Sequence, residues 1–459
     1  MKLLPETIAA LATPAGRGGI GIIRVSGPST LHIAKKIIGF IPKPRYATLS
    51  VFKDSEGSFL DEGVALYFPK PHSFTGEDVL ELQGHGGPVI MDRLLKNVIQ
   101  IGARLARPGE FCETAFLNNK IDLVQAEAVA DLINASSEEA ARSAIRSLQG
   151  KFSKRINELV RSLVELRTYI EAAIDFPTEE IDFLVEKIIE EKLEKLLKKV
   201  EEIEITAKQG ALLQHGISVV IAGEPNVGKS SLLNLLSGQE TAIVTDIAGT
   251  TRDILRELIY IDGIPIQLLD TAGLRITEDI VEKEGIQRTK KALEQADLIL
   301  LIVDTARVEN AFQTSFTMIE QYLTNISSKK ETRVPIIVIE NKIDLTGEQP
   351  SQQKSDYLRI KLSVKTGDGI EILKEHLKEM VGLKTTNEST FMGRGRHCDA
   401  IKRSKTFLQR AYEQLVHQRA GELVAEDLLY AQNALSEITG EFTSDDLLGK
   451  IFSEFCIGK

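Results

Sequence analysis

The chain has 459 residues, too many for one ordinary hydrophobic core, so we expect roughly two to four domains. Its composition, 42% hydrophobic and 27% charged, is typical of a soluble globular protein, and no apolar run is long enough to span a membrane. The net charge of −10 decides nothing about nucleic acid, because an acidic protein can bind it through a local basic patch. Pro5 and Glu6 interrupt the short apolar stretch at the N-terminus, which makes a poor signal peptide, so we expect a cytoplasmic protein.

The first 120 residues mix short β-type runs with closely spaced Gly and Pro, which predicts an α+β domain. The runs are 18–27, 64–69 and 79–87. From Leu123 the sequence becomes helical and contains no proline until Pro177. A second helical run carries apolar residues spaced 4, 3, 4 and 3 apart, at Ile189, Leu193, Leu196, Val200 and Ile203. This seam favours packing within one helical bundle over an independent coiled coil, because it is too short for the latter.

The sequence changes again after His215, where nearly continuous Val, Ile and Leu strands alternate with helical segments. These strands are 217–223, 258–262, 266–273, 298–304, 334–344 and 358–367. Such strands predict a mostly parallel sheet covered on both faces. After about residue 380 the helical pattern returns and continues to residue 455, so the α/β unit is predicted to be an insertion between two halves of one helical domain.

The segment from Gly223 to Ser230 fits the phosphate-loop pattern, with an apolar strand before it and a helix after it. Its backbone N–H groups, including those of Val227, Gly228 and Ser231, are suited to wrapping phosphates at the positive end of that helix. Lys229 is expected to neutralise the β- and γ-phosphates, and Ser230 to bind Mg²⁺ through its hydroxyl.

Three further motifs at strand ends complete a GTP site. Asp270-Thr271-Ala272-Gly273 can hold Mg²⁺ through its carboxylate, directly or through water, and can offer a backbone N–H to the γ-phosphate. Asn341-Lys342-Ile343-Asp344 can select guanine, because the Asp344 carboxylate accepts from both N1–H and the N2 amino group. Ser363-Val364-Lys365 can present N–H groups to the guanine oxygen. Four motifs in this order, each at a carboxyl end of a strand, favour GTP strongly over ATP.

This order of motifs resembles a Ras-type GTPase domain of the TrmE–Era branch. The segment 245–253 resembles the first switch of that branch, and its Thr251 matches the threonine that completes the Mg²⁺ shell. Ras-like enzymes usually orient the attacking water with a Gln after the DxxG motif, but Leu274 stands there and cannot hydrogen-bond water. Arg252 and Arg275 lie nearby in sequence, but a surface arginine is too common to indicate an arginine finger.

The resemblance extends over essentially the whole chain to the MnmE (TrmE) family of tRNA-modification GTPases, through segments 12–27, 73–87, 107–128 and 436–459. In that family K⁺ bound between dimerised G domains replaces the arginine finger. Asn226 matches the potassium-binding Asn, and Thr245, Ile247 and Thr250 match the first-switch loop, whose Asp246, Ala248 and Gly249 complete the expected GTP contacts. Glu282 matches the catalytic Glu, although without the resemblance it would be read as a solvated helix residue.

The resemblance also implies that the N-terminal domain dimerises and binds a tetrahydrofolate in a fold like that of aminomethyltransferases. Arg24, Glu81, Lys120 and the terminal Lys459 match the family's folate contacts. Arg and Lys suit glutamyl carboxylates, and Glu can accept from a pterin amino group. Without the resemblance, Arg24 would be read as an edge-strand charge and Lys120 as a charge at a helix entry.

The three cysteines, Cys112, Cys398 and Cys456, form no CxxC pair, so neither a disulfide framework nor a structural zinc site is expected. Cys456 is fourth from the end, but a terminal Lys disfavours prenylation. The resemblance makes Cys456 a candidate functional thiol, and the alternative is a buried apolar side chain beside nearby phenylalanines.

The stretch 393–405 is the densest basic segment at a helix start, so it is the candidate surface for contact with tRNA phosphates. The alternative is that it forms a solvated helix face.

We therefore predict four segments: 1–122, folate binding and dimerisation; 123–215, the first helical part; 216–380, the G domain; and 381–459, the second helical part with the terminal CIGK. The resemblance implies a Mg²⁺- and K⁺-dependent GTP hydrolase. It would form a homodimer, join the FAD-binding flavoprotein MnmG in a heterotetramer, and act on tRNA. With 5-formyl- or methylene-tetrahydrofolate, the pair would add an aminomethyl or carboxymethylaminomethyl group at C5 of the wobble uridine. A ribosome-assembly GTPase and a folate-sensing scaffold remain as alternatives.

Overall fold

A computed structural model describes most of the chain. The described residues are 6–135, 137–175, 183–224, 226–239, 256–261, 264–270, 296–305, 334–355, 357–380, 391, 393–418, 421–441, 445–453, 455–456 and 458. The chain divides into two compact units. The first comprises residues 1–134, 144–201 and 399–459, and the second comprises 135–143 and 202–398.

The N-terminal part of the first unit is a six-stranded sheet with the order β3-β4-β5-β2-β1-β6. Its strands are β1 (Ile8–Leu11), β2 (Gly21–Ser26), β3 (Thr48–Lys53), β4 (Phe59–Phe68), β5 (Val79–Gly84) and β6 (Arg104–Leu105). In this sheet β1 and β6 pair in parallel, and the other neighbours are antiparallel. The α+β prediction for this region is confirmed.

Alternation along β2 separates the two faces of this sheet. Ile23 and Val25 are fully buried in the core formed with α1 (Thr30–Ile38) and α2 (Pro88–Ile101). Arg24, between them, faces the opposite side, because successive side chains of a strand point to opposite faces. The reading of Arg24 as an edge-strand charge is wrong, since β2 lies inside the sheet between β5 and β1.

An ion pair with a buried carboxylate joins β6 to α3 (Glu110–Leu117). The Glu110 carboxylate accepts from Arg104 Nη1 and Nη2 at 2.9 and 2.6 Å, and from the Arg107 backbone N–H at 2.7 Å. Burial alone would raise the pKa of Glu110, but these donors outweigh it and hold that pKa below its usual range.

Helices form the rest of the first unit. These are α4 (Leu123–Ile133), α6 (Lys151–Asp175), α14 (Gly421–Thr439) and α15 (Asp445–Ser453), together with parts of α5 (Glu138–Leu148), α7 (Phe183–His215) and α13 (Gly395–Glu413). Helix α4 begins with a capping box, in which the Asp122 carboxylate accepts from the Gln125 N–H at 2.8 Å and the Gln125 side chain accepts from the Asp122 N–H at 3.0 Å.

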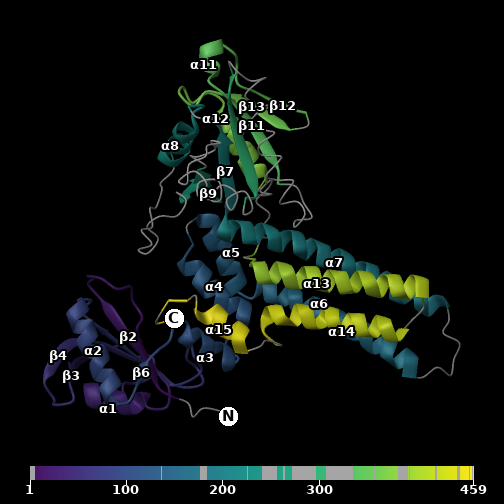
Figure 1. The fold of residues 1–459 in the computed structure, drawn as a ribbon. Helices are drawn as coiled ribbons and strands as arrows, with labels where there is room; N and C mark the ends of the chain where they lie inside the picture. The colour runs from purple at the N-terminus through teal and green to yellow at the C-terminus, as the bar shows by residue number, and fades with distance from the viewer. Residues whose placement is uncertain are drawn as a thin grey trace, which may run out of the picture. The chain divides into compact units, whose positions relative to one another are not determined.

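The helical segments before and after the α/β insertion pack side by side in this unit, as Figure 1 shows for α6, α7, α13 and α14. Arg167 on α6 donates to Gln432 on α14 at 2.8 Å, and Tyr412 on α13 donates to Glu190 on α7 at 3.0 Å. All five residues of the 189–203 seam are buried, which agrees with packing within a bundle.

The second unit contains a seven-stranded sheet with the order β12-β13-β11-β10-β7-β9-β8. Its strands are β7 (Ile217–Gly223), β8 (Arg256–Ile261), β9 (Ile264–Asp270), β10 (Leu298–Asp304), β11 (Ile336–Asn341), β12 (Ser351–Lys354) and β13 (Leu358–Leu362). The five central strands are parallel, and the edge strands β8 and β12 are antiparallel. The described helices of this unit include α8 (Lys229–Gln239) and α12 (Ile370–Met380). The predicted mostly parallel sheet is confirmed.

Within the described parts of the chain, every helix is too short or too polar to cross a bilayer.

Replacing Glu110 with Gln should destabilise the N-terminal sheet by about 2 kcal/mol at neutral pH, because two arginines lose their carboxylate acceptor. The pKa of Glu110 is lower in the folded protein than in the unfolded chain, where it is about 4.3. The contribution of Glu110 to the free energy of unfolding is therefore complete above the unfolded pKa and is lost as the pH falls through the folded pKa. The wild type and Glu110→Gln should therefore converge in acid. Hydrogen exchange in β1 and β6 measures the gap in stability between the wild type and Glu110→Gln, and Glu113→Gln is the control. A gap of constant size between neutral and acidic pH would contradict the account.

Candidate functional site

The phosphate loop runs from the end of β7 into the first turn of α8. Asn226 takes a left-handed backbone conformation with φ of 64° and is exposed. Gly228 has φ of 104°, and a Cβ at this position would overlap the side-chain Nδ2 of Asn341. Only glycine satisfies both demands, so the second glycine of the loop pattern is fixed by the close approach of another loop.

The charged and hydroxyl side chains of the loop lie at the start of α8. Lys229 Nζ donates to the carbonyl oxygens of Gly223 and Glu224, at 2.9 Å each. Ser230 and Ser231 occupy the next two positions of the helix and are exposed. The lysine therefore lies across the loop, and the two hydroxyls stand at the positive end of the helix, where anions such as phosphates are favoured.

Asn341, the last residue of β11, connects three loops. Its side-chain Nδ2 donates to the Val227 carbonyl oxygen at 2.7 Å, and its Oδ1 accepts from the Val364 backbone N–H at 3.0 Å. The residue is only 3% exposed. One buried amide thus fixes the phosphate loop and the loop after β13 relative to each other, and both of its polar atoms are satisfied.

The residues after Asn341 form the predicted base-recognition corner. Asp344 Oδ1 accepts from the Ser363 hydroxyl at 2.7 Å, so the two motifs that were predicted to read guanine touch each other. Lys342 has φ of 75°, and its Nζ bonds Asp304 Oδ2 at 2.7 Å. The Thr305 hydroxyl donates to the Asn341 carbonyl oxygen.

Asp304 and Thr305 were missed by the sequence analysis. Asp304 is the last residue of β10, and Thr305 follows it. Strand β10 lies between β7 and β11 in the sheet, so the place where this strand ends was the available signal. Carboxyl ends of adjacent parallel strands collect at one edge, and the residues after β10 belong to the same corner as those after β7 and β11.

Several predicted site residues lie outside the described residues. They are Thr245, Asp246, Ile247, Ala248, Gly249, Thr250, Thr251, Thr271, Ala272, Gly273, Glu282 and Lys459, as are Arg252, Leu274 and Arg275. Asp270 ends β9 and its backbone is opposite Ile221 of β7, which brings it to the same edge of the sheet as the phosphate loop.

On the N-terminal sheet, Arg24 and Glu81 are brought together across the β2–β5 pair. Arg24 Nε and Nη2 each lie 3.0 Å from Glu81 Oε1, and Arg24 Nη1 donates to the Gly458 carbonyl oxygen at 3.4 Å. The guanidinium also lies 5.8 Å from the centre of the Phe111 ring. The C-terminal segment therefore meets the predicted folate residues through its penultimate residue.

Lys120 is placed by a different loop. Its Nζ donates to the Pro71 carbonyl oxygen at 3.0 Å, and no direct bond joins it to Arg24 or Glu81 in the described structure.

Cys456 is exposed, which makes the alternative of a buried thiol wrong; Cys112 is the buried cysteine. The Cys456 carbonyl oxygen accepts from Gly109 N–H at 3.3 Å, and this bond holds the end of the chain against the loop before α3.

The basic stretch 393–405 is partly neutralised within the protein. Arg403 pairs with Asp399 at 2.9 Å and with Glu437 at 2.6 Å, and Lys405 pairs with Glu201 at 3.2 Å. These ion pairs support the alternative of a solvated helix face over an RNA-binding surface.

Comparison with known proteins covers the whole chain. The family model of the GTP-binding protein TrmE N-terminus matches residues 7–120, and that of the MnmE helical domain matches residues 123–456. The chain is 67% identical over 457 residues to the tRNA modification GTPase MnmE of Coxiella burnetii (strain Dugway 5J108-111), covering 100% of this chain and 99% of that protein. The chain belongs to the MnmE family of tRNA modification GTPases. The prediction of a GTP-hydrolysing enzyme is thereby confirmed.

A second relative, the tRNA modification GTPase MnmE of Proteus mirabilis (strain HI4320), is 57% identical, with 99% of both chains covered. Among solved structures, the FeoB G-domain from Methanococcus jannaschii has a TM-score of 0.25 and 20% identity, and covers 36% of this chain and 97% of that chain.

Replacing Asn341 with Ala should lower the affinity for GDP by at least about tenfold, because the Val227 carbonyl and the Val364 N–H lose their buried partner. Titration with a fluorescent GDP analogue measures the change. Asn234 on α8 is exposed, so Asn234→Ala is a matched control that should bind normally. An Asn341→Ala affinity within about twofold of the wild type would show that the amide does not organise the site.

Proposed function

We propose that this protein is a potassium-stimulated GTP hydrolase whose cycle serves the modification of the wobble uridine in tRNA. The observation that carries the proposal is the Asn341 bridge, which joins the phosphate loop to both proposed guanine-reading motifs in a member of the MnmE family. In this proposal, Asp344 accepts from the guanine N1–H and amino group. The segment Ser363–Lys365 presents N–H groups to its carbonyl oxygen.

The Mg²⁺ site proposed here consists of Ser230, Thr251 and Asp270. Ser230 fits, because its hydroxyl is exposed in the first turn of α8, and Asp270 fits, because it ends the strand beside β7. A bound Mg²⁺ would neutralise charge on the β- and γ-phosphates. Lys229, which already lies across the loop, would hold the same phosphates from the other side.

The K⁺ site proposed here uses Asn226 with backbone oxygens of Thr245, Ile247 and Thr250. Asn226 fits a role at an intermolecular surface, because its side chain is exposed at the tip of the phosphate loop. A cation in this position would supply the positive charge that an arginine finger supplies in other GTPases. Glu282 would act through water in place of the glutamine that Leu274 replaces.

The one-carbon chemistry is proposed for the N-terminal domain. Arg24, Glu81, Lys120 and Lys459 would hold 5-formyl- or methylene-tetrahydrofolate. Glu81 is 15% exposed and Arg24 is 22% exposed, so both can face a ligand while they bind each other. The Glu81 carboxylate can accept from the amino and ring N–H groups of a pterin, and Arg24, which donates to Glu81 Oε1, holds that carboxylate in place. Cys456, exposed near Gly458, remains a candidate functional thiol.

We further propose the segment boundaries 1–122, 123–215, 216–380 and 381–459 as functional domains, and a cytoplasmic homodimer that joins the flavoprotein MnmG and tRNA. The boundary at residue 122 is supported by the family models, whose matches end at 120 and begin at 123. In this assembly FAD belongs to the partner, and GTP hydrolysis opens and closes the G domains to gate modification.

GTP hydrolysis should be at least about tenfold faster in K⁺ than in Na⁺ at equal ionic strength, because K⁺ is the cation proposed to supply the charge of an arginine finger. Asn226→Ala should remove the difference while GDP binding persists. Phosphate release measured in the two salts tests this. Equal rates in the two salts for the wild type would refute the cation assignment.

The tRNA role is tested by mass spectrometry of tRNA nucleosides from a strain in which the gene is deleted. Loss of the C5 wobble modification, restored by the wild type and not by Glu282→Ala, is the expected result. Intact modification with defective ribosomal particles would favour the ribosome-assembly alternative. Intact modification with normal ribosomes would favour the folate-sensing scaffold.

A further inference from the structure

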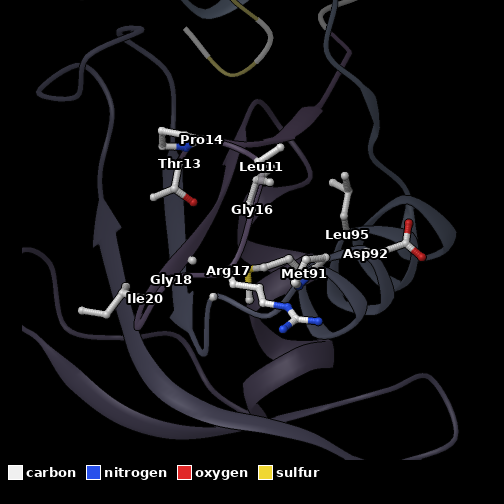
Figure 2. Close-up of a pocket in the computed structure, with 14 residues that line it drawn as sticks. Leu11, Thr13, Pro14, Gly16, Arg17, Gly18, Ile20, Met91, Asp92 and Leu95 are labelled. Carbon is white, nitrogen blue, oxygen red and sulfur yellow. The ribbon is translucent and has the colours of Figure 1, made fainter.

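A cavity of ≈ 530 Å³ opens on the N-terminal domain, between the loop that joins β1 to β2 and the start of α2. Figure 2 shows that side chains from this loop and from α2 surround one space. The volume lies within the range of about 300–1,000 Å³ that is usual for small-molecule sites. Nothing in the proposed GTP or folate site uses these residues.

The walls of the cavity are formed mainly by apolar side chains and by the backbone of glycines. Leu11, Met91 and Leu95 form one side, and Gly16, Gly18 and Gly86 line others. Glycines leave flat backbone surfaces, and thioether and leucine side chains make good contacts with a ring. Such walls suit a planar heteroaromatic group.

Polar groups stand at the rim. Arg17 is exposed and lines the cavity, so its guanidinium can reach a ligand anion such as a phosphate. The Thr13 hydroxyl oxygen accepts from the Ile22 backbone N–H at 3.2 Å, which fixes this side chain at the cavity wall. Asp92 of α2 also lines the cavity, and its carboxylate is paired with Lys96 at 2.7 Å. The cavity therefore combines an apolar slot with an arginine and an ion-paired carboxylate at its edge.

A His–Asp pair lies next to this cavity. His85 directly precedes the lining residue Gly86, and both its backbone N–H and its Nδ1 bond the Asp61 carboxylate, at 2.8 and 2.7 Å. A Cβ at Gly84 would overlap Asp61 and would lie 3.4 Å from Met91 Cε, so the pair and the cavity share one wall.

The pair holds the imidazole in one tautomer. Burial raises the pKa of Asp61, but hydrogen bonds from the His85 side chain and backbone and from the Glu62 N–H outweigh it and leave that pKa lowered. The ionised Asp61 can only accept, so Nδ1 of His85 carries a hydrogen, and in the neutral imidazole Nε2 is then an acceptor. The His85 side chain is 75% exposed, so this acceptor is open to a ligand.

The cavity is separate from the predicted folate residues. Gly21, which lines it, and Ile23 face the α2 side of β2, whereas Arg24 faces the other side. A ligand in the cavity would therefore lie on the opposite face of the sheet from the Arg24–Glu81 pair.

We propose that this cavity binds a uridine nucleotide, with the base in the apolar slot, its phosphate on Arg17, and its N3–H donated to Nε2 of His85. This rests on the proposed function, in which a uridine of tRNA is the group to be modified. The acceptor on His85 suits uracil, whose N3 carries a hydrogen, and does not suit cytosine, whose N3 is itself an acceptor.

The test is binding of UMP, CMP and uridine, measured by ligand-observed NMR on the full chain saturated with GDP and Mg²⁺. Saturation keeps the probes out of the G domain. The expected result is that UMP binds, and that CMP binds at least about tenfold more weakly. Displacement of UMP by 5-formyltetrahydrofolate, or equal binding of UMP and CMP, would overturn the proposal.

Four substitutions at three positions locate the site. Ile20 lines the cavity and is 65% exposed, so Ile20→Trp should block the opening without disturbing the core and should reduce UMP binding by at least about tenfold. Arg17→Ala should weaken UMP and leave uridine unchanged, whereas Arg17→Lys should retain UMP. His85→Ala should remove the preference for UMP over CMP. UMP binding that is indifferent to Ile20→Trp would contradict the assignment.

The GTPase rate of each variant should remain at the wild-type value, since none of these residues belongs to the G domain. Wobble modification in the deletion strain separates the cavity assignment from the proposed function. If the wild type restores modification and UMP does not bind, the cavity assignment fails alone. If the deletion leaves modification intact, the proposed function fails whatever UMP does.

Discussion

The nucleotide site depends on one buried amide. Asn341 donates to the phosphate loop and accepts from the loop after β13, and Gly228 must lack a Cβ for the amide to come so close. Because the amide has few alternatives once it is buried, the three loops hold one arrangement. Asp344 and Ser363 are bonded to each other, and they lie in the loops that the Asn341 amide holds in place. The loops proposed to recognise guanine and to bind phosphate are therefore parts of one connected structure.

The two sheets of the protein bring residues together in different ways. The parallel strands of the second unit end at a common edge, so short motifs far apart in sequence meet there. In the mostly antiparallel N-terminal sheet, side chains instead alternate between the two faces along each strand, and β2 presents Ile23 to a core and Arg24 to the opposite face. This alternation is what allows one small domain to carry an ion pair at Arg24 on one face and the cavity beside Met91 on the other.

Much of this could be predicted from the sequence, because strand runs, the helical seam and the phosphate loop are local patterns. The 217–223 strand was predicted to the residue, and all five seam positions are buried. Contacts between distant segments could not be predicted. Neither the Asn341 bridge, the Thr305 bond nor the His85–Asp61 pair has a spacing that reveals it. The reading of Arg24 without the resemblance, as an edge-strand charge, failed for the same reason, since strand order in a sheet is not a local property.

Nucleotide specificity of Asp344→Asn tests the central claim most directly. If the carboxylate at this locked corner reads the guanine N1–H and amino group, an amide should reject GTP and accept XTP, whose C2 oxygen needs a donor. Hydrolysis rates with GTP and XTP should exchange their order between the wild type and the variant. A variant that keeps its preference for GTP would contradict the account.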